Sequence, residues 1–110
     1  MTDIDVQTLN SLRDATGADF LSELMNTFFE DTPIQFENMK NALAAGDAEA
    51  FRRAAHSLKS NAATFGAVKF SALARELEMM GRDKNLEVGD KLQALQEAFV
   101  QTREQLNGLR

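Results

Sequence analysis

The fold is decided by residues 51–66, which read FRRAAHSLKSNAATFG. Apolar residues recur every three or four positions in this stretch, at Phe51, Ala55, Leu58, Ala62 and Phe65. At about 100° per residue these five fall on one face of an α-helix, and the charged residues fall elsewhere. Such a helix is stable only when its apolar stripe packs against other stripes, so the stretch predicts one member of a helical assembly.

The same periodicity extends outward in both directions along the chain. Further apolar stripes at helical spacing cover residues 6–12, 21–28, 36–43, 70–80 and 92–106. The stripes are expected to end at glycines, which are helix breakers: Gly17, Gly46, Gly66 and Gly81. Nothing in the sequence is typical of a β-strand, because good helix formers dominate and β-branched residues are few.

Two further signals set expected helix ends. Asp47 is a favourable N-cap for the helix of residues 51–65. Residues 31–33, Asp-Thr-Pro, are expected to separate the second stripe from the third. The residue before a proline avoids the helical region, and Pro33 suits a first helical turn.

These stripes predict an all-α fold. Short loops make consecutive helices antiparallel, so we expect an antiparallel, up-down-up-down four-helix bundle with a short additional helix at the N-terminus. A chain of 110 residues fits one domain, and we assign residues 1–110 to it.

Composition narrows the classes of function. A net charge of −5 argues against nucleic-acid binding, and no apolar run approaches the roughly 20 residues of a membrane span. The N-terminus lacks the features of a signal peptide, and there is no cysteine for disulfides or zinc-thiolate sites; we expect a cytoplasmic protein. Residues 52–84 nevertheless hold seven basic and three acidic residues, a net +4 that leaves −9 for the remainder. This local excess suggests an anionic ligand or acidic partner, although chance explains it as well.

The single histidine, His56, lies about 140° around its helix from Phe51, on the outer face. Arg52 precedes it by one turn and Lys59 follows by one turn, and the small residues Ser60 and Ala63 come next. An idle surface histidine is the simplest interpretation. A metal site is disfavoured, because no second histidine and no cysteine exist. No nucleophile elbow and no phosphate-binding glycine loop is present either.

A phosphoryl acceptor would explain these neighbours better. Neutral imidazole is a nucleophile at physiological pH, and phosphoryl transfer depends on positioning and charge stabilisation. A lysine beside the ring would offset phosphoryl charge, and small residues would let a partner protein approach.

Residues 55–67, AHSLKSNAATFGA, resemble the histidine phosphotransfer (HPt) domains of two-component phosphorelays, whose signature is His-x-Leu-Lys-Gly, then small residues and Gly-Ala. The likeness extends to Phe28-Phe29, to the turn around Gly46-Asp47 and to Leu77-Glu78. It implies that His56 accepts phosphate on Nε2 and that Lys59 supports the anion. It also implies no intrinsic kinase activity and no cofactor of its own, since receiver domains supply the aspartate and Mg²⁺. Ser60 departs from the family's glycine but is still small.

The helix of residues 70–80 contributes further candidates. Glu78, Arg75 and Arg82 are all expected to face away from the core. HPt domains commonly carry a polar residue at the Glu78 position that reaches the phosphorylated helix, so Glu78 is expected to accept a hydrogen bond from His56 Nδ1. The alternative is that Glu78 only pairs with Arg75 or Arg82. Arg52, Arg75 and Arg82, with Ser60 and Ala63, are candidates for partner docking, and a solvated charged face is the alternative.

The sequence is therefore interpreted as a phosphocarrier, not an enzyme, that relays phosphate through His56 between aspartates of receiver domains. Expected partners are receiver domains and a hybrid histidine kinase, with no nucleic acid, membrane or metal, and the protein is expected to be a monomer. Two alternatives stay open: a non-catalytic module that docks receiver domains, and the phosphoacceptor module of a chemotaxis-type histidine kinase.

Overall fold

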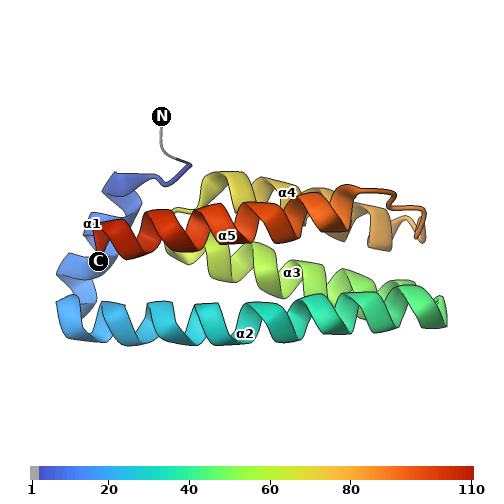
Figure 1. Cartoon of the computed structure of the whole chain (residues 1–110), viewed down its shortest axis with the longest axis horizontal. Helices are drawn as coiled ribbons and strands as arrows, with labels where there is room; N and C mark the ends of the chain where they lie inside the picture. Colours follow the sequence, from blue (N-terminus) through green and yellow to red (C-terminus); the bar gives the residue numbers. More distant parts are fainter. Residues whose placement is uncertain (1–2) are drawn as a thin grey trace.

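Five helices make up most of the computed structural model, which describes residues 3–110. They are α1 (Val6–Thr16), α2 (Ala18–Ala45), α3 (Ala48–Thr64), α4 (Val68–Arg82) and α5 (Lys91–Leu109) (Figure 1). Over residues 3–110 the only β-type pairing recorded is an isolated antiparallel bridge between Ile4 and Ala67. The all-α prediction is confirmed.

Helices α2 to α5 form an up-down-up-down bundle with extents of 42 × 25 × 19 Å (Figure 1). Helix α3 packs against α2 and most extensively against α4, α4 packs against α5, and α5 closes the bundle against α2. Helix α1 lies across one end of the bundle, where α2 begins and α5 ends, and contacts α2 and α3. The four-helix bundle with a short N-terminal helix is therefore confirmed.

The expected break at residues 31–33 is wrong, because α2 runs unbroken from Ala18 to Ala45 with Pro33 inside it. Pro33 is exposed, and its effect on the helix is to leave the carbonyl four residues earlier without an N–H donor. The neighbouring Thr32 is buried, and its hydroxyl donates a hydrogen bond to the Phe28 carbonyl at 2.7 Å. Packing of the buried face of α2, with Phe28 and Phe36, therefore overrides the local preference of proline.

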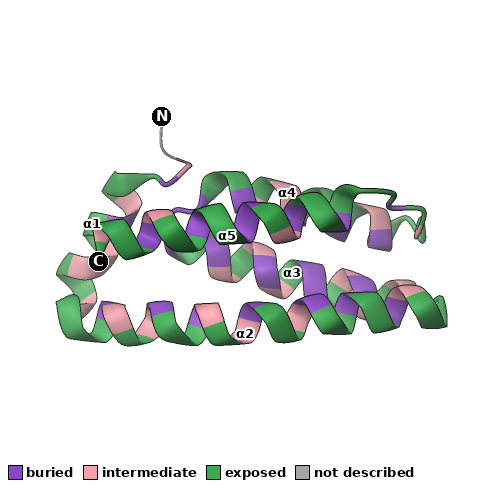
Figure 2. Cartoon of the chain, in the orientation of Figure 1, coloured by how far each residue is buried: buried purple, intermediate pink, exposed green. Residues whose placement is uncertain are grey.

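The core lies between the four long helices, where buried positions of each helix turn inward and exposed ones outward (Figure 2). Rings of Phe28 and Phe36 from α2, Phe70 from α4 and Phe99 from α5 meet with centroids 5.9 to 6.4 Å apart. Burying such a side chain contributes about 1.5–3 kcal/mol. This ring cluster packs α2, α4 and α5 against one another.

The ends of α3 are fixed by the residues predicted to cap and break it. The Asp47 carboxylate accepts a hydrogen bond from the Ala50 N–H at 3.0 Å. After the other end, Gly66 has φ +74°, and a Cβ there would lie 2.6 Å from the Asp5 carbonyl. The Asp5 N–H also donates to the Gly66 carbonyl at 2.7 Å, so the N-terminal segment binds the α3–α4 turn.

Gly81 does not end its helix, contrary to the sequence prediction, since α4 continues to Arg82. Its role is close packing. A Cβ at Gly81 would lie 3.0 Å from the N, Cα and Cβ atoms of Arg52, so a side chain here would push α4 away from α3. The close approach of α3 and α4 is important because the candidate functional site lies between the outer faces of these two helices.

Candidate functional site

His56 lies on the outer face of α3. The neighbouring Ala55 and Leu58 are fully buried, and this fixes the rotation of the helix so that the imidazole points outward with 52% of its side chain exposed. A partner protein can therefore reach the ring directly.

Glu78 of α4 lies beneath the ring. Its Oε2 is 2.5 Å from His56 Nδ1, and its Oε1 accepts a hydrogen bond from Lys59 Nζ at 2.6 Å. The expectation that Glu78 faces away from the core is wrong, because its side chain is only 3% exposed. The close packing of α4 on α3 encloses the carboxylate between the helices, where it meets His56 and Lys59 rather than Arg75 or Arg82.

The Glu78 carboxylate is ionised at neutral pH. Burial acts most strongly on it and alone would raise its pKa, but the hydrogen bonds from Lys59 and His56 outweigh burial and hold the pKa below the ordinary value of 4.5. An ionised carboxylate only accepts hydrogen bonds, so Nδ1 of His56 must carry the proton. In the neutral ring, Nε2 then keeps its lone pair.

Lys59 is held by the same carboxylate. Its side chain is 27% exposed, and its backbone carbonyl accepts a hydrogen bond from the Ser71 hydroxyl of α4 at 3.0 Å. One positive charge is thereby kept beside the imidazole at a defined position. Ser71 was not singled out from the sequence, because its partner is a backbone atom of another helix.

The sequence matches the family described as Hpt domain over residues 23–110. The chain belongs to the Hpt family. Its function is accordingly histidine phosphotransfer in phosphorelays.

A solved structure shows the same relationship. The Hpt chain resembles histidine-containing phosphotransfer protein B (HptB) from Pseudomonas aeruginosa PAO1 with a TM-score of 0.89 and 29% sequence identity. The similarity covers 96% of this chain and 92% of that one. No curated protein sequence matches significantly.

The remaining candidate residues of this Hpt domain lie on the same two helices as His56 and Glu78. Ser60 and Ala63 are exposed on α3, and Arg75 and Arg82 are exposed on α4. Arg52 is only half-buried but is already paired, because its guanidinium donates two hydrogen bonds to Glu49, which raises the pKa of Arg52.

Two further features concern residues 3–110 of the Hpt domain as a whole. This part of the chain has no group of three or more His, Cys, Asp or Glu side chains placed to hold a metal ion. None of the five helices is long and apolar enough to cross a membrane.

Proposed function

We propose that His56 is the residue through which this Hpt domain exchanges phosphate. The observation that carries the proposal is the exposed imidazole whose Nδ1 is held by the buried Glu78 carboxylate. This leaves Nε2 as the nucleophile. Residues 1–110 act as one Hpt domain in this scheme.

In the forward step, the Nε2 lone pair attacks the phosphorus of an aspartyl phosphate on a receiver domain. The bond between phosphorus and the aspartate oxygen breaks, and the aspartate leaves as a carboxylate. The reverse step passes the phosphoryl group to the aspartate of another receiver. Nδ1–H stays hydrogen-bonded to Glu78, so the positive charge that develops on the ring is stabilised without loss of a proton.

Lys59 is proposed to support the transferred group. Its ammonium lies one helical turn from His56 and shares the carboxylate with the ring, so it is close enough to offset phosphoryl charge. Ser60 and Ala63 give the receiver access to the ring, and the exposed Arg75 and Arg82 contribute positive charge on α4. Arg52 contributes less positive charge to docking, because Glu49 is paired with it.

In the proposed scheme, partner proteins supply the phosphate and the metal ion. The domain has no kinase activity and no cofactor of its own. A hybrid kinase supplies phosphate through a receiver domain, and Mg²⁺ is bound by the receiver, where it neutralises phosphoryl charge. The domain acts in the cytoplasm as a monomer that docks one receiver at a time.

The test is phosphotransfer from a radiolabelled receiver domain to this protein and to the His56→Gln variant. We expect acid-labile, alkali-stable label on the wild type and none on the variant, with circular dichroism showing that both are folded. Since His56 is the only histidine, equal labelling of the variant would remove it from the role.

A further inference from the structure

A groove of about 630 Å³ lies over α4 beside the start of α1 and the end of α3. Its lining includes three small residues: Ala63, Gly66 and Ala72. Two larger apolar side chains also line it, Val68 and Met79, which are 54% and 46% exposed. Thr8 of α1 contributes to the wall. The shape suits an apolar side chain inserted by another protein.

The groove is continuous with the phosphotransfer site. Ala63, on its α3 side, lies seven residues after His56 on the same helical face, which corresponds to about 10.5 Å along the axis. Ser71 and Arg75 line its α4 side, and the Ser71 hydroxyl is bonded to the Lys59 carbonyl. The groove therefore lies directly beside the residues that support His56.

A receiver domain docked on His56 must also contact residues about 10.5 Å from it. Specific complexes bury about 800 Å² on each partner, equal to a disc of about 16 Å radius. A footprint centred on His56 therefore reaches the groove over α4 and, on the α2 side of α3, a groove of about 430 Å³ and a smaller one of about 160 Å³.

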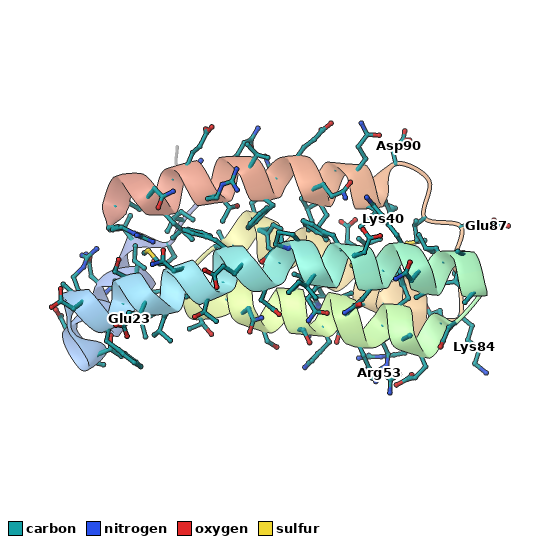
Figure 3. The ribbon with its side chains drawn as sticks, turned by 60° about the horizontal axis from the view of Figure 1, so that its bottom comes forward. Glu23, Lys40, Arg53, Lys84, Glu87 and Asp90 are labelled. Atoms are coloured by element: carbon teal, nitrogen blue, oxygen red, sulfur yellow. The ribbon has the colours of Figure 1, made fainter. Side chains whose placement is uncertain are left out.

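The two larger grooves differ in the size of their apolar side chains. The one on the α2 side has only alanines as apolar lining, beside the polar residues Gln35, Asn38, Asn41, Asp47, Arg53 and Ser57. The Arg53 side chain projects from α3 (Figure 3). The groove over α4 offers the larger apolar side chains of Met79 and Val68 beside small residues, and Arg75 and Glu76 also line it. Interface centres are enriched in methionine and other large apolar side chains, so an apolar anchor fits the groove over α4 better than the one on the α2 side.

We propose that the groove over α4, bounded by α1, binds an apolar side chain of the receiver domain that exchanges phosphate with His56. This docking site rests on the proposed function of His56. It makes Val68, Ala72 and Met79 determinants of which receivers are served, whereas His56, Lys59 and Glu78 perform the transfer.

The experiment compares two arginine substitutions of exposed alanines. Ala72→Arg fills the groove over α4, and Ala45→Arg, its matched control, fills the one on the α2 side. Each variant is phosphorylated by the receiver domain used to test His56 and, separately, by phosphoramidate, a small donor that needs no docking. The quantity measured is the ratio of the two rates.

We expect Ala72→Arg to lower this ratio about tenfold or more, as loss of an interface hot spot does, and Ala45→Arg to leave it within about twofold, as a peripheral substitution does. A Met79→Ala variant should also lower the ratio, and Met79→Leu should restore it. An unchanged ratio in Ala72→Arg and Met79→Ala would overturn the proposal, and a loss confined to Ala45→Arg would move the docking site to the α2 side. Failure of the wild type to accept phosphate from either donor would instead reject the proposed function itself.

Discussion

The Glu78 carboxylate lies directly under the His56 ring, with 2.5 Å between Oε2 and Nδ1. The two residues are 22 positions apart and belong to different helices, so their contact exists only because α4 packs closely on α3. The geometry of the His56 ring thus depends on how these helices pack, so under the proposed role of His56, substitutions at their interface should affect transfer as well as stability.

Gly81→Ala tests this dependence. The new methyl group would lie 3.0 Å from backbone atoms of Arg52, and relieving that contact should separate the helices and cost about 1–3 kcal/mol of unfolding free energy. We expect urea unfolding to show this loss and phosphotransfer to slow with it. Gly108→Ala is the control, because a Cβ there meets nothing within 4 Å. Equal stability of the two variants would contradict the packing role of Gly81.

Lys59→Ala should slow phosphotransfer by about tenfold or more, because it removes the positive charge nearest the phosphoryl group. The bundle should stay folded but lose about 1–3 kcal/mol, since the buried Glu78 carboxylate keeps only one partner. Rates from a labelled receiver and circular dichroism measure the two effects. Lys40→Ala, on the exposed side of α2 (Figure 3), should transfer as the wild type does. Wild-type rates in Lys59→Ala would reject the supporting role.

Glu78→Gln should change how stability depends on pH. The pKa of Glu78 is lowered in the folded protein, so its carboxylate stabilises the fold above about pH 4.5, and this contribution is lost as the pH falls through the lowered value. The variant should be less stable than the wild type at neutral pH, and the two unfolding free energies should converge on acidification. Urea titrations between about pH 3 and 7 measure both curves. Parallel curves would show that Glu78 titrates alike in the folded and unfolded chains.

Pro33→Ala should stabilise the domain. It restores an N–H donor inside α2 at an exposed position and removes a residue that disfavours helix interiors by about 3 kcal/mol relative to alanine. We expect an increase of about 1–3 kcal/mol in unfolding free energy, with transfer rates unchanged because Pro33 lies outside the site. Destabilisation would mean that α2 needs the bend or stiffness that proline provides.

The positions of the helices could be predicted from the sequence where the residues of each helix alone determine its start, end and buried face. The apolar stripe from Phe51 to Phe65 and the cap at Asp47 are local signals, and both are present in the structure. The break at Pro33 was predicted wrongly because a local rule was applied where tertiary packing of Phe28 and Phe36 dominates.

The candidate site was predictable in part for the same reason. The position of His56 on the outer face of α3 follows from that helix alone, and the side chain is indeed exposed. The burial of Glu78 does not follow from the periodicity of α4, because it depends on how closely the neighbouring helix approaches. The glycine that permits this approach, Gly81, was interpreted as a helix end, since sequence alone does not reveal a contact with Arg52.

The ring cluster that joins α2, α4 and α5 consists of phenylalanine alone, and the sequence contains no tryptophan or tyrosine. Phenylalanine does not emit at the wavelengths used to observe indole fluorescence, so this domain is optically silent there. In a mixture with a tryptophan-containing receiver, all indole emission comes from the receiver, and its change on complex formation can be followed without attaching a dye to either protein.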